Sequence, residues 1–466
     1  MGCGSVKSAR CGRRSGCVGG RASCFAAAAA ALLVLLLVPA GVAAANPAGQ
    51  WSHVYAGPGR GNDAFVAVTT DPSGNAYAAG SARGAPPVGQ EALLASYRAD
   101  GSKRWVRLLG APAGGAYFAA DVVCDSTRHI WVAGGTGGSR GDVLAIRYST
   151  MGARLWQRAL DFSGKADRAV AMATDAQGCG YIAADCTGAK GHRLVVYKLS
   201  RTGRVLWRRT VGRGGANSQP ADILVNGETV VVCGWERSSS GSRAPLVAAL
   251  TTSGSARWTS YDASASGGAG EALALSASST TVWVTGKLIE AGVSQRSFVS
   301  AYGLDGVKTG TYETPAGALP EHLTTVAAEA DGTAWVGGTQ DTASGPTAAI
   351  HHLVPAGTVA QSYVFPRTSD AVWADSCVAL CADDGGSVWM AGLQKTKAYV
   401  TGFTAGTGPT PAWWGLGTVP ASPATVPNVV SVGAAAWTSG AVYLAGAARA
   451  ADGHSDALLI RFSPLR

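Results

Sequence analysis

Apolar and polar residues alternate with a period of two along most of the chain, in short runs separated by turns rich in Gly, Asp and Pro. This alternation is typical of β-strands, and no helical period follows residue 45. One apolar run that closes on a small residue returns eight times. Its closing positions are residues 80, 134, 184, 234, 286, 338, 392 and 446. The pattern therefore predicts eight structural repeats of about 52 residues.

Each repeat predicts four short strands, which the first repeat displays most clearly. A strand over 64–69 leads through a tight turn at 71–75 to a second strand that closes at Gly80. A long loop, a third strand over 93–97 and a second tight turn then lead to an outer strand that begins near Trp105. Asp71, Pro72 and Gly74 suit the positions of a type I turn. Four antiparallel strands at this period are typical of a β-propeller blade.

The two ends of the repeat array complement each other. The eighth repeat ends with its third strand at 458–462, whereas Trp51 to Tyr55 has the pattern of a fourth strand without its blade. Pairing the two would close the ring and remove exposed strand edges, which promote aggregation. We therefore predict an all-β, closed eight-bladed β-propeller with four antiparallel strands per blade, whose N-terminal strand completes the last blade. The predicted domain spans 46–466, with blades ending near 110, 161, 212, 262, 313, 366 and 417, and 428–466 plus 51–55 as the closing blade.

Aromatic residues recur at two positions of the repeat. In the second strand they are Tyr77, Trp131, Tyr181, Trp283, Trp335, Trp389 and Tyr443. At the start of the outer strand they are Trp51, Trp105, Trp156, Trp207 and Trp258. Exposed rings of this kind could stack on sugars, but a fixed register in nearly every repeat favours packing against the neighbouring blade. Each such ring buries about 150–250 Å².

The first 45 residues differ from the rest of the chain. Five Lys and Arg residues and no acid precede an Ala/Leu/Val-rich run over 25–42, and Ala43 to Ala45 supply a small-residue cleavage site. This predicts a signal peptide over 1–45, a secreted, cell-surface or periplasmic location, and no integral membrane domain after its removal. An uncleaved N-terminal anchor and export through Arg13-Arg14 as a twin-arginine signal are the alternatives.

The net charge of the chain limits the class of partner. The chain carries 38 Lys and Arg against 29 Asp and Glu. Because five of these cations lie in the leader, the remainder of the chain is nearly neutral, which argues against nucleic acid as a partner.

The cysteines bear on the covalent structure. Disulfides are permitted outside the cell, and a bridge between Cys186 and Cys233 is left open. Cys377 and Cys381 lie four residues apart in one strand, so we predict that they share a face and are too distant to bridge each other.

Acidic residues recur near the start of the first strand, which lines the channel of a propeller. Asp63, Asp167, Glu321 and Asp375 stand 17 residues before the closing position, and Glu271 stands 15 before it. Their carboxylates could converge at one mouth of the channel, and Ca²⁺, which prefers oxygen ligands, could bind at Asp63 and Asp375. In the alternative interpretation, each carboxylate accepts N–H bonds from its own loop or from the neighbouring blade.

The long loops on the same face as these acids carry the other candidate ligand contacts. They are Trp235, Arg237, His192 and His454. Variable loops on a rigid scaffold are common binding surfaces. The sequence holds no H-E-x-x-H or Walker motif, and no catalytic residue is assigned. His351 and His352 are adjacent in a strand and are expected to point to opposite faces.

The motif Asp71-x-x-Gly74-Asn75-x-Tyr77-x-x-Gly80, together with the Gly-x-x-x-Trp hairpins, resembles the secreted bacterial β-propeller repeats (SBBP). It is also similar to quinoprotein-type propellers with PQQ-like repeats and to their non-enzymatic relatives. The resemblance covers the chain after the leader and implies a propeller in a bacterial envelope. Quinoprotein enzymes carry a vicinal cysteine pair, and no two cysteines are adjacent here, so PQQ is not expected.

These observations predict a monomeric binding or scaffold module at the cell envelope. Its loops on one face would engage a protein or a polysaccharide. The alternative is an enzyme, either a quinoprotein-like oxidoreductase or a propeller lyase or hydrolase that acts at the channel mouth.

Overall fold

The computed structural model describes residues 51–110, 115–214, 217–238, 241–261, 269–289, 296–315, 319–343, 345–364, 376–383, 387–394, 397–404, 413–417, 429–438 and 440–462. The predicted signal peptide and Asp375 lie outside these residues. Every regular element among them is a β-strand. The described residues therefore include no helix that is long and apolar enough to cross a membrane.

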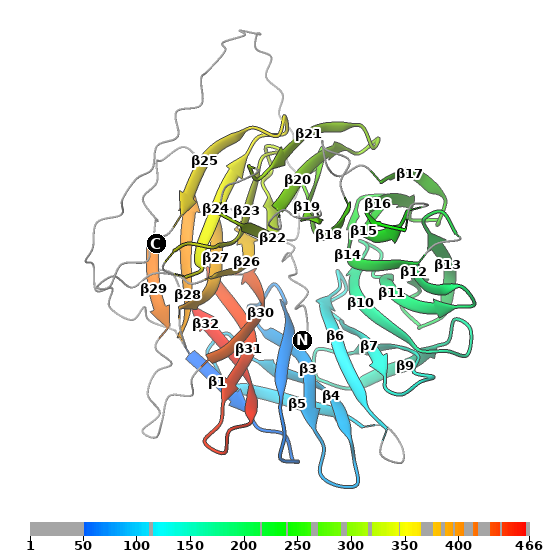
Figure 1. Cartoon of the computed structure of the whole chain (residues 1–466). Coiled ribbons are helices and arrows are strands. Elements are labelled where there is room, and N and C mark those ends of the chain that lie inside the picture. The colour runs from blue at the N-terminus through cyan, green and yellow to red at the C-terminus, as the bar shows by residue number, and fades with distance from the viewer. Residues whose placement is uncertain are drawn as a thin grey trace.

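The strands form eight four-stranded antiparallel sheets arranged as blades around a ring (Figure 1). Blades one and two comprise β2 (Ala64–Thr70), β3 (Ala76–Arg83), β4 (Gln90–Tyr97), β5 (Lys103–Leu109), β6 (Tyr117–Cys124), β7 (Ile130–Thr136), β8 (Val143–Tyr148) and β9 (Arg154–Leu160). Blades three and four comprise β10 (Asp167–Thr174), β11 (Gly180–Gly188), β12 (Gly191–Leu199), β13 (Val205–Val211), β14 (Ser218–Asn226), β15 (Thr229–Arg237), β16 (Arg243–Thr251) and β17 (Ala256–Ser260).

Blades five and six comprise β18 (Ala269–Ala277), β19 (Thr281–Ile289), β20 (Arg296–Gly303), β21 (Lys308–Glu313), β22 (Glu321–Ala328), β23 (Ala334–Gln340), β24 (Thr347–Leu353) and β25 (Val359–Val364). Blade seven comprises β26 (Ser376–Ala382), β27 (Ser387–Gln394), β28 (Lys397–Thr404) and β29 (Trp413–Gly417). Blade eight comprises β30 (Val429–Thr438), β31 (Ala441–Arg449), β32 (Ser455–Phe462) and the N-terminal strand β1 (Trp51–Tyr55).

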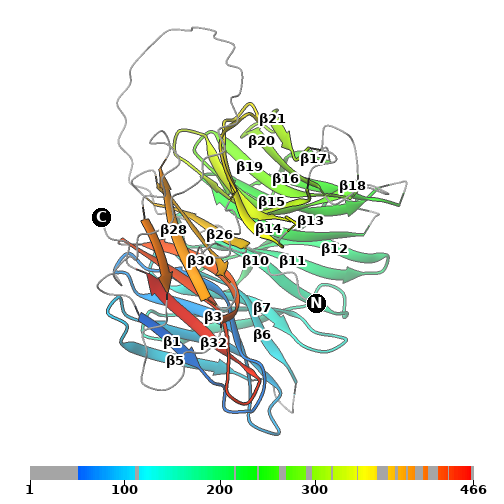
Figure 2. The same ribbon diagram turned by 60° about the vertical axis from the view of Figure 1, so that its left-hand side comes forward.

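The ring closes by pairing the two ends of the chain. Strand β1 runs antiparallel to β32, with Trp51 opposite Arg461 and Tyr55 opposite Ala457. Figure 2 shows β1, in blue, beside β32, in red. The predicted eight-bladed propeller and its closure by the N-terminal strand are thereby confirmed. The pairing covers an edge of β32 that would otherwise be open to other chains.

The first strand of each blade lies innermost and contacts the first strands of both neighbours, as β2 contacts β6 and β30. Every one of these eight strands contains a β-bulge, which in β2 falls between Phe65 and Ala67. A bulge adds one unpaired residue and so shifts the alternation of side chains between the two faces. The prediction that Cys377 and Cys381 share a face is therefore wrong. Cys377 packs in the core toward blade six and Cys381 in the core toward blade eight.

The hydrophobic cores lie between blades. Each second-strand aromatic is buried in the core that its blade shares with the next one, as Tyr77 is between blades one and two and Trp131 between blades two and three. The same holds for Tyr181, Trp283, Trp335, Trp389 and Tyr443. These rings thus join neighbouring blades.

Cys186 and Cys233 belong to two separate cores. Cys186 lies between blades two and three, and Cys233 lies between blades four and five. Both are free thiols, so the bridge left open for this pair does not form.

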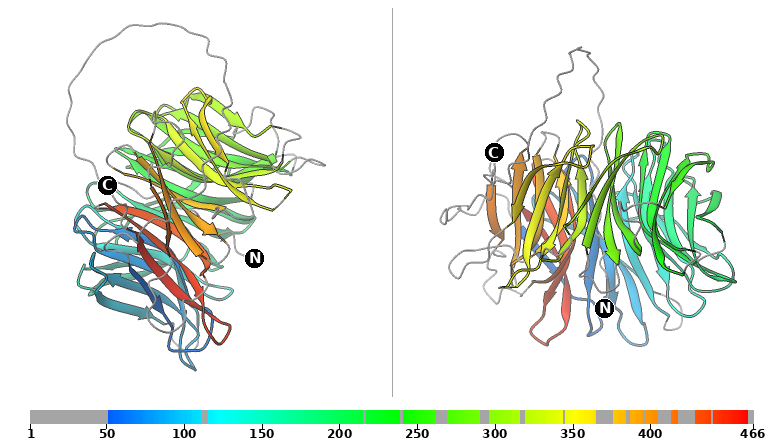
Figure 3. Two further views of the ribbon diagram at one scale, coloured as in Figure 1. Left: turned by 90° about the vertical axis from the view of Figure 1, so that its left-hand side faces the viewer. Right: turned by 45° about the horizontal axis from the view of Figure 1, so that its top comes forward.

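The hairpins end on two opposite faces of the ring (Figure 3). The turn face carries the tight turns between first and second strands and between third and fourth strands. The loop face carries the hairpin ends between second and third strands and the connections between blades. The two faces differ in how regularly their contacts repeat.

On the turn face, an aspartate organises the first turn of four blades. Asp71 Oδ1 accepts the N–H groups of Ser73 and Asn75, while its Oδ2 accepts the Tyr77 hydroxyl at 2.9 Å. The same bond to a buried ring recurs in the pairs Asp125–Trp131, Asp175–Tyr181 and Asp383–Trp389. The Asp-to-aromatic spacing of the repeat therefore satisfies the turn and the buried ring together.

The outer-strand tryptophans fasten each blade to the next on the same face. Trp105 Nε1 donates to Thr150 O at 2.9 Å, and the Trp105 ring lies against Gly152 of that turn. Gly152 has a φ of 77°, and a Cβ there would lie 2.7 Å from the indole, so only glycine fits. The same Trp–Gly contact forms between Trp51 and Gly101, Trp156 and Gly203, Trp207 and Gly254, and Trp258 and Gly306.

Candidate functional site

The loop face of blades three to five is built on extended hairpins. Strands β11 and β12 pair out to Gly188 and Gly191, and β15 and β16 pair out to Arg237 and Arg243. The prediction that His192, Trp235 and Arg237 lie in long loops is therefore wrong, because all three belong to strands. Because the ladder hydrogen bonds continue almost to the tips, His192 and Trp235 are held on strands.

Asp185 is the centre of one polar cluster on this face. Its buried carboxylate accepts His192 Nδ1 at 2.7 Å, Gln219 Nε2 at 3.0 Å and Arg168 Nη2 at 3.3 Å. These partners come from β12, β14 and β10, so the cluster spans blades three and four. The side chains of His192 and Arg168 are about half exposed. The buried carboxylate thus fixes a cation and an imidazole at the surface.

Glu271 is the centre of a second cluster, between blades four and five. Its buried carboxylate pairs with Arg243 and, at 3.0 Å, with Lys287 Nζ. The Arg243 guanidinium also lies over the Trp235 ring, 4.3 Å from the ring centroid. An acid, two cations and an indole therefore meet where two blades adjoin.

The two clusters are continuous through blade four. Gln219, which donates to Asp185, lies directly opposite Trp235 in the pairing of β14 with β15. The Trp235 ring in turn lies under Arg243 of the second cluster. We call the resulting surface the cationic strip. It consists of Arg168, His192, Gln219, Trp235, Arg243 and Lys287.

A second aromatic–cation pair borders the strip. The Arg213 guanidinium lies 3.8 Å from the Tyr261 ring centroid, and the Arg213 N–H donates to Glu236. Burial, followed by the hydrogen bond and charge of Glu236, raises the pKa of Tyr261. Tyr261 therefore stays protonated at neutral pH and contributes a neutral ring.

Exposed charge on this part of the loop face is mainly positive. The segments that form this part of the loop face are 161–168, 185–193, 211–219, 235–244, 269–271 and 287–289. Among their described residues, the exposed cations are Lys165, Arg168, Lys190, Arg213, Arg237 and Arg243. The exposed acid there is Asp161, whereas Asp167, Asp185, Glu236 and Glu271 are buried. Acids lie beneath the surface and cations stand on it, which favours an anionic ligand.

Two of the predicted channel acids are backbone acceptors. Asp63 accepts the N–H groups of Gly57 at 2.5 Å and Arg83 at 2.7 Å. Asp167 accepts those of Phe162 at 2.7 Å and Thr187 at 2.9 Å. Burial raises the pKa of both carboxyl groups despite these bonds. Each carboxylate therefore ties an inter-blade connection to a neighbouring hairpin.

Glu321 is engaged elsewhere, in blade six. It accepts His351 Nε2 at 2.6 Å, and the His351 ring lies beside Tyr312 of blade five. His352 bonds Glu329 at 2.9 Å instead, so the two adjacent histidines point in opposite directions. Burial, then the charge of Glu321, raises the pKa of Tyr312.

The structure thus divides the predicted site residues into separate places. His192, Trp235, Arg237 and Glu271 share the loop face of blades three to five, while His454 acts electrostatically on Asp63 where blade eight meets blade one. Within the described ranges, no three His, Cys, Asp or Glu side chains are grouped closely enough to hold a metal ion. Asp375 falls outside those ranges, so Ca²⁺ binding at Asp63 and Asp375 stays a prediction.

Sequence reasoning placed Arg243 in a loop of this face but missed Asp185, Arg168 and Lys287. One signal could have found part of this set, namely the residue that directly follows each closing position. Along the chain these residues are Ser81, Gly135, Asp185, Trp235, Lys287, Thr339, Leu393 and Ala447. A charged or aromatic residue occupies the position only in blades three, four and five, where the strip forms.

Comparisons with known proteins concern the fold. No protein-family model matches the chain, and no curated protein matches it. The polysaccharide lyase Uly1 superposes with a TM-score of 0.45 at 9% identity, over 86% of this chain and 90% of that one. The β-propeller domain of the Trilobed protease from Pyrococcus furiosus gives 0.41 at 8% identity, over 72% and 93%. A subtype N11 neuraminidase-like protein of A/flat-faced bat/Peru/033/2010 gives 0.37 at 11%, over 63% and 87%.

Proposed function

We propose that this protein is a secreted β-propeller binding module of the cell envelope whose cationic strip binds an acidic polysaccharide. The observation that carries the proposal is the gathering of exposed cations around Trp235, above acids that are buried and already paired. Arg and Lys recognise carboxylate or sulfate groups, and Arg does so in two-pronged fashion. The exposed part of the Trp235 ring offers an apolar surface to a sugar ring.

A polysaccharide suits this surface better than a protein partner does. Lysine is depleted from protein–protein interfaces, whereas Lys165, Lys190 and Lys287 all lie on this part of the loop face. A flexible polyanion instead gains from cations spaced along a rigid surface, and this gain falls with salt.

The envelope location rests on the predicted leader over 1–45 and on the resemblance to secreted propeller repeats. N-terminal sequencing of the protein exported by a bacterial host tests it. A mature chain that begins near residue 46 supports secretion, and a chain that retains its leader supports an anchored form instead.

The binding proposal is tested by affinity electrophoresis of the chain from residue 46 onward. We expect gels with polygalacturonate to retard the protein, neutral dextran to leave it unretarded, and added salt to weaken the retardation. Replacing Arg168 and Arg243 together with alanine should reduce the affinity by about a hundredfold, since each contributes a charge-assisted contact.

The matched control is Arg204→Ala, which removes an exposed cation from the turn face of blade three. It should leave retardation unchanged. Equal retardation by the acidic and the neutral polymer, or equal weakening by the control, contradicts the proposal.

One specific observation favours an enzymatic alternative, namely a lyase or hydrolase acting on the same polysaccharide. Asp185 holds Nδ1 of the half-exposed His192. The Nε2 of His192 has no partner among the described residues and could act as a general base toward a ligand on the strip. Release of new chain ends from polygalacturonate, abolished by His192→Ala while binding persists, supports catalysis. Binding without any release supports a module that only binds.

A further inference from the structure

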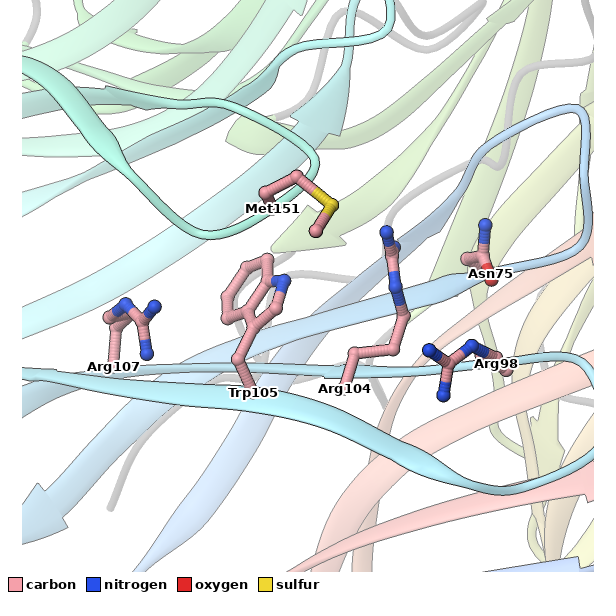
Figure 4. A pocket seen from close by; sticks show the side chains of 6 residues that line it. All are labelled: Asn75, Arg98, Arg104, Trp105, Arg107 and Met151. Atoms are coloured by element: carbon pink, nitrogen blue, oxygen red, sulfur yellow. The ribbon is translucent and has the colours of Figure 1, made fainter.

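A pocket of about 550 Å³ opens on the turn face between blades one and two, on the opposite side of the ring from the cationic strip. Its walls are Asn75, Arg98, Arg104, Trp105, Arg107 and Met151. Figure 4 shows the three arginines spread along one side of the pocket, with Met151 of the next blade above Trp105. Blade one thus supplies the polar wall and blade two the apolar rim.

The three guanidinium groups are held in place by neutral groups. Arg104 Nη1 donates to the Tyr77 hydroxyl at 2.7 Å, Arg107 Nε to Gly152 O at 2.7 Å, and Arg98 Nη1 to Ser102 Oγ at 3.0 Å. In the part of the chain that the structure describes, none of the three is ion-paired with a carboxylate. Their positive charge is therefore uncompensated by a direct partner.

The two nearby acids have other partners. Asp71 accepts the Tyr77 hydroxyl and the side-chain amide of Asn75. Asp100 is fully exposed, and its pKa is lowered first by hydrogen bonds from Ser102 and only then by the charge of Arg98. Neither acid lines the pocket.

The pocket departs from the repeat. The residues equivalent to Arg98, Arg104 and Met151 are Ser149, Leu155 and Thr202 where blade two meets blade three, and Ser200, Leu206 and Ser253 where blade three meets blade four. Both of those junctions close through the same Trp–Gly contact. Arg98, Arg104 and Met151 are therefore not needed to hold two blades together. Arg107 does recur, as Arg158 and Arg209, and Arg209 Nε donates to Gly254 O just as Arg107 Nε donates to Gly152 O.

We propose that this pocket binds a small organic anion through a carboxylate or phosphate group. Guanidinium groups bind such oxyanions with paired, charge-assisted hydrogen bonds. The volume lies in the usual range for small-molecule sites. Met151, which is 74% exposed, and the Trp105 edge would contact the apolar part of the ligand. The site is independent of the polysaccharide site, because it lies on the other face.

Isothermal titration of the chain from residue 46 onward tests the proposal with three probes: citrate for carboxylates, adenosine monophosphate for phosphate, and adenosine as the uncharged reference. We expect at least one anion to bind, and adenosine to bind at least about tenfold more weakly or not at all. Arg98→Gln and Arg107→Gln should each weaken the anion about tenfold, as expected for one charge-assisted contact.

Arg98→Gln is the cleaner variant, because Arg98 is exposed and its bond goes to the exposed Ser102. An unchanged melting temperature shows that this variant is folded. Arg204→Gln, which removes a distant cation from the same face, is the matched control and should bind like the wild type. Failure of both anions to bind, or equal weakening by Arg98→Gln and Arg204→Gln, overturns the proposal.

Discussion

The pKa values of carboxyl groups shift in opposite directions on the two faces of the ring. On the turn face, the pKa is lowered for Asp100, Asp125 and Asp331. On the loop face, the pKa is raised for Asp63, Glu91, Asp142, Asp167 and Asp456. For Asp125 and Asp331, burial alone would act upward, but it is outweighed by bonds to the ionised form.

The difference comes from side-chain donors, which add to the backbone N–H groups on the turn face. Asp125 receives the His129 N–H, the Thr127 hydroxyl, the Trp131 indole and the Arg147 guanidinium. The burial that raises the pKa of Asp456 is instead reinforced by the nearby acids Asp63 and Asp452. A turn that recurs in several blades can supply the donors that its carboxylate needs, whereas a face that varies leaves some ionised groups at a cost in stability. Such costs are typical of functional surfaces.

The largest effect is expected when the ring, which supports both faces, is opened. A chain that begins at residue 56 lacks β1 and leaves β32 without its partner, so we expect aggregation through the exposed edge. Size-exclusion chromatography with light scattering, against a chain that begins at residue 46, measures it. A monomer with an unchanged melting temperature would show that β1 does not close the ring.

The next effect is confined to the turn face. Asp125→Ala leaves Arg147 without its 2.6 Å partner, in a site where the two side chains are 7% and 0% exposed, and should lower the free energy of unfolding by about 3–5 kcal/mol. Urea unfolding measures the change. The control Asp331→Ala, at an exposed turn residue, should cost less than about 1 kcal/mol. Polygalacturonate binding should survive in both variants.

Arg243→Ala should give the reverse result on the loop face. Because Arg243 is exposed and Glu271 keeps Lys287 as a partner, the free energy of unfolding should change by less than about 1 kcal/mol. The affinity for polygalacturonate should fall about tenfold. A stability loss as large as that of Asp125→Ala would mean that the strip is part of the scaffold and that the two faces do not differ in this way.

The smallest effect is a pH-dependent gain on the loop face. A carboxyl group whose pKa is raised by folding stabilises the protein when protonated, and this contribution is lost as pH rises through the raised value. Asp456→Asn should therefore raise the melting temperature slightly at neutral pH, and the gain should vanish below the ordinary Asp pKa. Melting curves across this pH range test the sign. A lowered melting temperature at neutral pH would contradict the raised pKa.

Part of the candidate site was readable from the sequence, but its composition was not. Trp235 and Glu271 stand out because they break the repeat or recur in register. Arg168 and Lys287 do not, since nothing local distinguishes a strand cation that meets a buried acid from one that meets only water. The pairing of Arg243 with Glu271 was not readable either, because that partner lies 28 residues away, in another blade.

The eight blades, the Asp-to-aromatic turns and the closing strand could be predicted from the sequence alone. Period, turn chemistry and alternation are local properties, and they recur from repeat to repeat along the chain. Two things depended on the folded ring: the face on which a side chain lies after a bulge, and the residues that become neighbours when the blades assemble. One extra residue in each innermost strand moved Cys377 and Cys381 to opposite faces, and an apolar run gives no sign of it. The ring brought Asp185, Trp235 and Lys287, about 50 residues apart along the chain, onto one surface. Such neighbours are set by the closure of the whole array and not by any single repeat.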